Sequence, residues 1–261
     1  MLTNSPFAEL SASVPPGLMQ AYVVLMIVLV LAGTLFDVWH KGSAKYFFEN
    51  WRKARSKGTQ DLSSGDLVSL AAQTAAVDVL TSAEFCNQRR RAAHLLTMYG
   101  FLLYVITTAV MVFSYPTPAT PAPAILPFLW YVGALMVCIG GYWFWLFIRV
   151  DVSAEGHSPF RIVQADLFIL SLLGSATFGL IWAVLQYAGS SWAVVFLGLY
   201  LIATTVLFGS IPWSKFSHMF FKPAAAFQKR VAAADGSRSN LPAPADRPAI
   251  FGSARGQPNH Y

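Results

Sequence analysis

Long apolar runs, each bounded by charged or turn-forming residues, dominate this chain. A helix that crosses a bilayer needs about 20 predominantly apolar residues, because the hydrocarbon core is about 30 Å thick and a helix rises about 1.5 Å per residue. Three runs reach this length and are separated by polar segments: Met19–Val38, Ala92–Phe113 and Ile125–Ile148. A fourth run, Leu167–Ser214, has no charged residue and is too long for one span.

The fourth run is interrupted near its middle by Gly189-Ser190-Ser191, a combination typical of turns. It therefore predicts two helices, Asp166–Tyr187 and Trp192–Trp213, joined by a tight hairpin. The predicted fold class is an all-α integral membrane protein with five transmembrane helices. The first span is not expected to be a cleaved signal peptide, because it lacks a basic n-region and follows a segment that contains Pro15 and Pro16.

The composition supports a membrane protein. Hydrophobic residues make up 56% of the chain and charged residues only 11%, whereas soluble domains have about 25% charged residues. Two cysteines, Cys86 and Cys138, are too few for a disulfide-dense module or a four-cysteine zinc or iron–sulfur site within this chain. A net charge of +6 in such a chain indicates a basic cytoplasmic face, and no nucleic-acid partner is expected.

The distribution of the 18 Lys and Arg residues predicts the orientation. Nine lie between the first and second spans, seven follow the fifth, and the other two, Arg149 and Arg161, flank the segment after the third. None lies in the N-terminal segment, in Tyr115–Ala124 or in the Gly189 turn. Because cytoplasmic loops carry the excess of basic residues, the N-terminus is expected outside and the C-terminus in the cytoplasm.

Three regions follow from this topology: an external N-terminal segment (residues 1–18), a five-helix membrane domain (19–222) with a cytoplasmic loop (41–91), and a C-terminal tail (223–261). The tail is rich in Ala, Pro, Arg and small polar residues, a composition that predicts disorder.

The cytoplasmic loop is long enough to have structure of its own. Tyr46–Lys53 mixes aromatic and basic residues like a helix that lies in the membrane interface. Asp66–Val79 predicts a second, mildly amphipathic helix.

Two histidines are the main candidates for chemistry. His94 lies three residues after Arg91 at the start of the second span, and His218 lies three residues after Lys215 at the end of the fifth. Since these spans run in opposite directions, the two side chains are expected at similar depth. Two neutral imidazoles from facing helices are the ligands that a b-type haem requires. Histidines that simply sit at the interface remain the alternative.

Each ligating imidazole needs a partner for its second nitrogen, and helical spacing suggests Thr97 and Ser214. Asp166 opens the fourth span and suits a first-turn carboxylate stabilised by the helix dipole, with a proton relay as the alternative. Basic residues at the same membrane level either bind haem propionates or form the ordinary positive flank: Arg90, Arg91, Arg149 and Arg161. The remaining histidines, His40, His157 and His260, are not expected to be ligands, and Cys86 is expected to be a structural thiol.

Two segments carry a family resemblance. Arg91–Phe101 (RAAHLLTMYGF) and Ile211–Pro223 (IPWSKFSHMFFKP) resemble the haem-ligand segments of the nitrate reductase gamma-subunit superfamily. That superfamily includes membrane subunits of heterodisulfide reductase-like, sulfite reductase-associated and quinone-interacting (Qmo-type) complexes, which the upstream Glu84-Phe85-Cys86 resembles more than nitrate reductase itself. The short chain without an iron–sulfur domain is similar in build to the membrane anchors of adenylylsulfate (APS) reductase in sulfur oxidisers.

The resemblance implies that His94 and His218 are metal ligands to a haem b on the cytoplasmic side, with Arg91 and Arg149 as further cofactor-binding residues. The ligands of an outer haem would fall near Tyr104 and Tyr200, where this chain has no histidine. The chain is therefore expected to hold at most one haem.

The implied function is that of a membrane anchor and electron-transfer subunit in the bacterial inner membrane. It would link cytoplasmic flavin/iron–sulfur reductase subunits, such as an APS reductase that oxidises sulfite with AMP, to the quinone pool, and would not be catalytic alone. One alternative is a haem-free anchor whose two histidines pack or hydrogen-bond quinone. Another is a small transporter, although the midplane lacks charge and has no interrupted helix pair beyond Gly140-Gly141.

Overall fold

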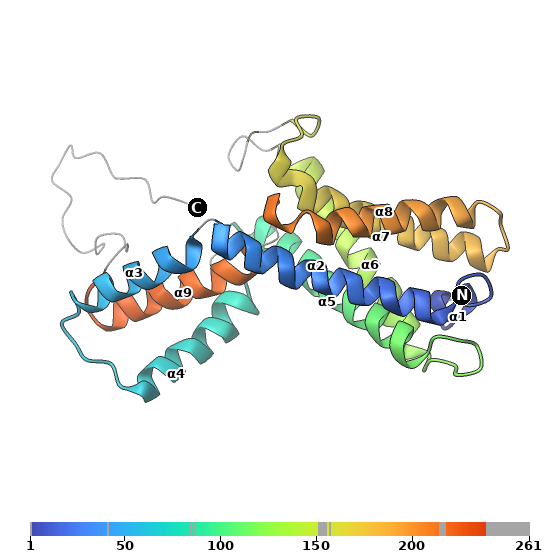
Figure 1. Ribbon diagram of the computed structural model, residues 1–261. Coiled ribbons are helices and arrows are strands. Elements are labelled where there is room, and N and C mark those ends of the chain that lie inside the picture. Colours follow the sequence, from blue (N-terminus) through green and yellow to red (C-terminus); the bar gives the residue numbers. More distant parts are fainter. Residues whose placement is uncertain are drawn as a thin grey trace. The chain divides into compact units, whose positions relative to one another are not determined.

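The computed structural model describes residues 2–40, 42–83, 85, 87–150, 156, 158–213 and 218–238, and within these ranges the regular structure is entirely helical (Figure 1). The chain divides into two compact units. The first, here called the transmembrane unit, comprises residues 1–41 and 82–218. The second, here called the accessory unit, comprises residues 42–81 and 219–261.

Four helices of the transmembrane unit are long and apolar enough to cross a membrane: α2 (Pro16–His40), α5 (Gln88–Ser114), α6 (Ile125–Trp143) with its π-helical continuation η2 (Phe144–Ile148), and α7 (Leu167–Tyr187). The fifth predicted span corresponds to α8 (Ala193–Gly209), an apolar helix of 17 residues followed by the 3₁₀ turn η4 (Ile211–Trp213). The all-α prediction is confirmed for the described residues, and the apolar helices indicate a membrane-embedded protein.

Helices α5 and α6 pack backbone against backbone through glycines. A Cβ atom on Gly100 would lie 2.7 Å from the carbonyl oxygen of Gly133, and one on Gly140 would lie 2.7 Å from the carbonyl oxygen of Ala93. Small residues at such positions let membrane helices approach closely. This contact fixes Gly140 of α6 at the level of Ala93 of α5, next to His94.

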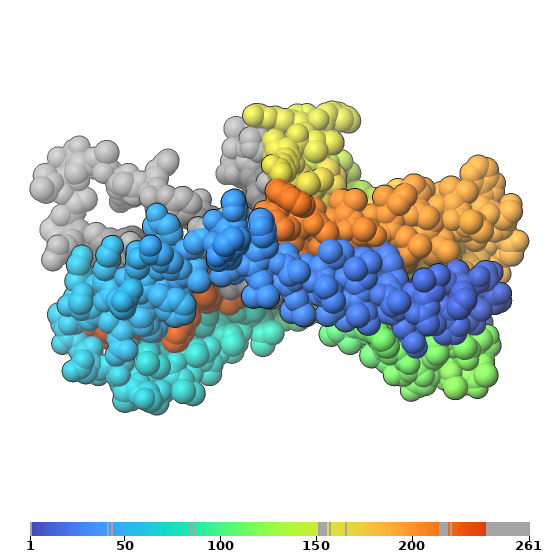
Figure 2. Space-filling view, viewed as in Figure 1, coloured from blue at the N-terminus to red at the C-terminus, as the bar shows by residue number. Residues whose placement is uncertain are grey.

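The hairpin between α7 and α8 is confirmed. Gly189 has a φ of +67°, a left-handed conformation that glycine adopts without steric cost, and the Ser190 amide donates to the carbonyl of Leu185 at 2.9 Å. Further along the pair, the hydroxyls of Ser175 and Thr204 lie 2.8 Å apart. Helix α2 packs along α8 and leaves much of its own surface exposed, with Leu35 at 70% (Figure 2).

A short helix that the sequence pattern did not predict, α1 (Pro6–Leu10), lies within the N-terminal segment. Phe7 is buried, with its ring centroid 5.7 Å from that of Trp130 and 5.5 Å from that of Trp182. Gln186 Nε2 donates to the carbonyl of Pro6 at 2.7 Å. The segment expected only to be external is therefore packed against the bundle.

The accessory unit contains α3 (Ser43–Arg55), α4 (Ser64–Gln73) with its π-helical continuation η1 (Thr74–Val79), and most of α9 (His218–Ala234). The two helices predicted in the cytoplasmic loop are thus confirmed. Trp51 stacks on Phe227 with ring centroids 5.5 Å apart. Arg230 donates to both carboxylate oxygens of Asp78, at 2.5 and 3.0 Å, and this hydrogen bonding raises the pKa of Arg230.

The predicted disorder of the tail is wrong for Pro223–Ala234, which belong to α9. Alanine and lysine favour a helix in this stretch, and Phe227 and Arg230 have partners within the accessory unit. The end of α9 is also tied to the α3–α4 connection, because the carbonyl of Asp235 accepts from the amides of Thr59 and Gln60 at 2.8 and 3.1 Å. Residues 239–261 lie outside the described residues.

Candidate functional site

His94 lies two turns into α5, and the start of this helix is fixed by its cap. The side chain of Asn87 accepts from the amides of Arg89 and Arg90 at 2.9 and 3.3 Å. An asparagine at this position satisfies helix amides that would otherwise lack partners. The cap therefore sets where the helix begins and at which level His94 lies.

The segment before α5 folds back onto the imidazole of His94. Ser82 Oγ lies 3.0 Å from His94 Nδ1, and the ring of Phe85 lies 4.8 Å from that of His94. Ser82 is buried at 3% exposure and has a φ of +50°, an uncommon conformation for serine. This left-handed turn brings the hydroxyl to the imidazole.

The hydroxyl partner expected from helical spacing, Thr97, is the wrong one. Thr97 Oγ1 donates to the carbonyl of Ala93 at 2.9 Å. Serine and threonine in helices commonly bond the carbonyl four residues earlier, and a partner from outside the helix takes the imidazole. Ser214, the partner expected for His218, lies outside the described residues.

Helices α5 and α8, which carry the second and fifth predicted spans, contact each other. The rings of Phe101 and Phe208 lie 6.5 Å apart, and Gly179 of α7 lies against both Tyr104 and Tyr200. His94 precedes Phe101 by seven residues, so both lie on the face of α5 that meets α8. The two helices therefore touch at this face through the Phe101–Phe208 ring contact.

His218 is the first residue of α9, and its side chain is not among those that the structure describes. It follows Phe208 by ten residues, in the antiparallel direction to the step from Phe101 to His94. Because α5 and α8 run in opposite directions, both histidines lie toward the same end of the helix pair from the Phe101–Phe208 contact. The pairing of the two imidazoles stays a prediction.

Aromatic side chains fill the bundle around Tyr104 and Tyr200, which are 4% and 6% exposed. The ring of Trp130 lies 5.2 Å from that of Tyr104, and Trp182 stacks on Tyr200 at 5.7 Å. The Tyr104 hydroxyl donates to the carbonyl of Ser175 at 3.3 Å. These are the two positions where the family resemblance would place an outer haem, and packed side chains take up that space.

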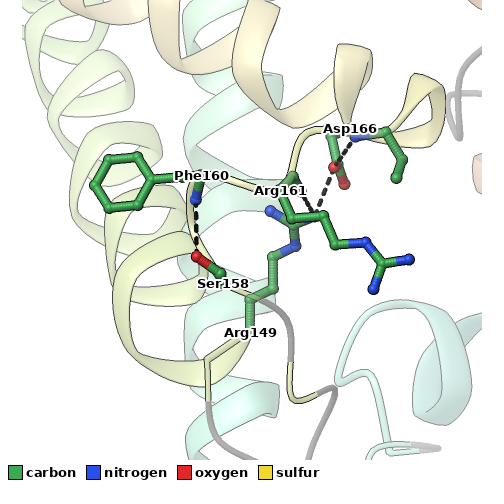
Figure 3. A network of polar contacts seen from close by, with 6 residues as sticks. Arg149, Ser158, Phe160, Arg161 and Asp166 are labelled. Carbon is green, nitrogen blue, oxygen red and sulfur yellow. Dashed lines mark hydrogen bonds and ion pairs between the residues drawn. The ribbon is translucent and has the colours of Figure 1, made fainter.

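A buried ion pair joins the end of α6 to the start of α7 (Figure 3). Arg149 Nη2 donates to Asp166 Oδ2 at 2.6 Å and to the carbonyl of Arg161 at 2.8 Å. The amide of Val163 donates to the same Asp166 oxygen at 2.9 Å. The Arg149 guanidinium also lies over the ring of Trp145, 4.0 Å from its centroid. Arg149 is only 2% exposed.

These contacts hold Arg149 between α6 and α7. Its charge is balanced by Asp166, and it lies nine residues beyond Gly140, about 13 Å along the helix from the level of His94. The cofactor-binding roles of Arg149, which has Asp166 as its partner, and of Arg91, one helical turn from His94, both stay predictions. Asp166 does stand at the start of α7, but its carboxylate binds Arg149 and the amide of Val163.

Two further residues were not singled out from the sequence. Ser82 gave no signal, because its role depends on an irregular backbone turn. Asp37 of α2 is 1% exposed, and the sequence could have pointed to it, because a carboxylate at the end of an apolar run is a functional candidate. His40 is exposed and stacks on Phe36. The predictions for Glu84, Cys86, His157 and His260 fall outside the described residues.

Among the side chains that the structure describes, no three His, Cys, Asp or Glu residues group as a metal site. A bis-histidine haem needs only two protein ligands, so this finding does not bear on it. Comparisons with protein-family models, with curated proteins and with solved structures gave no match. Any relationship of this chain to known proteins therefore rests on the two histidine-containing segments.

Proposed function

We propose that this protein is the membrane anchor and electron-transfer subunit of a quinone-linked oxidoreductase, with one b-type haem between His94 and His218. The observation that carries the proposal is the setting of His94. Its imidazole lies on the face of α5 that meets α8 and is held at Nδ1 by a buried hydroxyl.

The contact between Ser82 and His94 fits the chemistry of an axial ligand. A ligating imidazole normally donates its second N–H to a fixed acceptor, which sets the tautomer and the ring orientation. When Nδ1–H donates to the Ser82 hydroxyl, Nε2 is the nitrogen that would ligate iron. Phe85 packs against the ring and restricts its rotation further.

The second proposed ligand is His218, and the contact between α5 and α8 supports this assignment. A haem in this position would supply a one-electron relay between a partner's cluster and quinone. The protein's own part is to orient His94 through Ser82, to cover the imidazole with Phe85, and to offer Arg91 to a propionate.

The limit of one haem is supported by the packing around Tyr104 and Tyr200, which offers neither ligands nor space for another. An electron path across the whole bilayer is therefore not part of the proposal. Quinone would react in the half of the membrane that contains His94.

The proposed topology has five spans with the N-terminus outside and the C-terminus in the cytoplasm of a bacterial inner membrane. Helix α8 spans about 25 Å and η4 adds about 6 Å, so together they reach the thickness of the hydrocarbon core. The soluble partner is proposed to be a flavin/iron–sulfur enzyme of the APS reductase type, bound at the basic cytoplasmic face.

The decisive experiment is haem quantification on the purified full-length protein by pyridine haemochrome and reduced-minus-oxidised spectra. The expected result is one haem b per chain, lost in His94→Ala and in His218→Ala. His40→Ala is the matched control, because this exposed histidine stacks on Phe36 at the end of α2, and it should keep the haem. A protein without haem would favour the haem-free anchor, and two haems would contradict the one-haem proposal.

The partner is tested by purification from membranes in mild detergent. Recovery of a flavin/iron–sulfur protein that reduces a quinone analogue only in the presence of this chain is the expected result. Repeated recovery of the chain alone would count against docking. Substrate flux in liposomes without a redox partner would instead support the transporter.

A further inference from the structure

Helix α3 of the accessory unit has an inner and an outer side. Trp51 stacks on Phe227 of α9, Phe47 stacks on Trp51, and Ala54 is 6% exposed. These contacts fix the rotation of α3 about its own axis. The side chains that point away from α9 are therefore set by the packing.

One side of α3 combines an exposed phenyl ring with basic groups. Four exposed residues spaced i, i+3, i+7 and i+10 share this side and are here called the Phe48 stripe: Lys45, Phe48, Arg52 and Arg55. Phe48 is 61% exposed. An aromatic ring flanked by bases is typical of a helix that lies at the surface of a bilayer. The long basic side chains keep their charges among headgroups while their stems lie along apolar surface.

The covalent chain keeps the Phe48 stripe near the membrane. Helix α2 ends at His40 and α3 begins at Ser43, so the start of α3 lies within about 11 Å of the end of a helix of spanning length. Phe48 follows five residues later, about 8 Å along the helix. The Cα atom of Phe48 is thus within about 20 Å of the end of α2 at any angle between the two helices.

We propose that the Phe48 stripe binds anionic phospholipids of the membrane that α2 enters. Phe48 inserts at the boundary between headgroups and acyl chains, and Lys45, Arg52 and Arg55 contact the phosphates. The charge of α3 is complementary to such a surface, because it carries four bases and a single carboxylate, Glu49, which lies 4.0 Å from Lys45. This contact is independent of haem and of the redox partner, and it leaves the other faces of the accessory unit available to a soluble protein.

The test uses nitroxide labels on the full-length chain in nanodiscs, in a background of Cys86→Ser and Cys138→Ser. Phe48→Cys reports on the Phe48 stripe. Tyr46→Cys is the matched control, since Tyr46 is 68% exposed but lies on the opposite side of α3. Power saturation compares collisions with oxygen, which enters lipid, and with a nickel chelate, which stays in water.

When phosphatidylglycerol is added to phosphatidylcholine discs, the label at position 48 should gain oxygen contact and lose nickel contact, whereas the label at position 46 stays in water. The double variant Arg52→Gln/Arg55→Gln, or high salt, should abolish the difference, because headgroup attraction is screened. Lys53→Gln removes a charge from outside the Phe48 stripe and should leave it intact. Haem content and helicity should be the same in all variants.

Equal accessibility of the two labels in every disc would overturn the proposal. So would a label at position 48 that ignores the lipid and is immobilised only by a soluble partner protein, a result that would assign the Phe48 stripe to protein docking.

Discussion

The helices α5 and α8 meet in two different environments. Around Tyr104 and Tyr200 the space is filled by aromatic rings and by the hydrogen bonds of Ser175 to α5 and α8, with both tyrosines almost completely buried. Near His94 the imidazole is half-buried, and it is contacted by Ser82 and Phe85, which belong to an irregular segment. One pair of helices therefore has a packed half and a half where a polar side chain is held in a set orientation.

The contrast indicates how function and stability are divided along the bundle. Packed rings and close backbones stabilise helices in a membrane, where hydrophobicity does not drive them together. A ligand site needs instead a side chain whose direction is fixed while its surroundings admit another group. Substitutions around Tyr104 and Tyr200 should thus affect stability alone, and substitutions around Ser82 should affect the proposed haem alone.

The largest expected effect tests the role of Arg149 at the His94 end of the bundle. Arg149→Met should lower the free energy of unfolding by about 3–5 kcal/mol, because it leaves the buried carboxylate of Asp166 without its counter-charge. Denaturant titration in mixed micelles measures this loss.

The double variant Arg149→Met/Asp166→Leu separates a structural role from a cofactor role. Removing both charges should restore most of the stability, because a buried pair is often replaceable by apolar residues. The haem should stay bound at the wild-type stoichiometry. If the double variant is stable but loses haem, Arg149 binds a propionate as the sequence had suggested.

The next effect tests the packed half. Gly179→Ala would place a Cβ atom 2.6 Å from the Tyr104 hydroxyl, and overpacking of this kind costs about 1–3 kcal/mol. Gly198→Ala is the matched control, because nothing lies within 4 Å of its added Cβ atom. The temperature of thermal unfolding should drop for Gly179→Ala only, and the haem content should be unchanged in both variants. Loss of haem in Gly179→Ala would show that the two halves are coupled.

The sequence pattern was sufficient for the elements whose cause is local. The apolar runs located α2, α5, α6 and α7, and the Gly189 turn was found from glycine and serine. The two loop helices followed from a mixture of aromatic and basic residues and from a mildly amphipathic pattern. Each of these features depends on side chains within a few residues of one another.

The features that the pattern missed depend on contacts between distant segments. Helix α1 is short and is held by Phe7 between two tryptophans, and α9 continues past Pro223 where Phe227 and Arg230 find partners in the loop. The Ser82 hydroxyl reaches His94 only because of a left-handed turn, which no spacing rule reveals.

A smaller effect tests the half of the helix pair that contains His94. Ser82→Ala should leave stability nearly unchanged and weaken haem binding about 10–100-fold, the usual consequence of removing a partner that orients a metal-ligating histidine. The midpoint potential should rise, because the imidazole loses the acceptor that makes it more basic. Ser82→Thr keeps the hydroxyl and should restore both values. A spectrum, affinity and potential identical to wild type in Ser82→Ala would remove Ser82 from the site.

The smallest effect concerns acid, and it contrasts the starts of two helices. Hydrogen bonds from the Ser63 side chain, and then from its backbone amide, hold the pKa of Asp66 below its usual value at the start of α4. Because the folded-state pKa is the lower one, this stabilisation is present above the unfolded pKa and is lost as the pH falls through the folded pKa. Helix α5 begins at Asn87, an amide that does not titrate in this range.

Hydrogen exchange at decreasing pH, corrected for intrinsic rates, should therefore show the first turn of α4 opening while the first turn of α5 stays protected. Ser63→Ala should reduce the pH dependence of α4, because only the backbone amide at position 63 would still bond Asp66, and should leave α5 unchanged. Simultaneous opening of both helix starts would mean that acid acts on the whole bundle. The Asn87 cap that sets the level of His94 would then be no more resistant to acid than the exposed Ser63–Asp66 cap of α4.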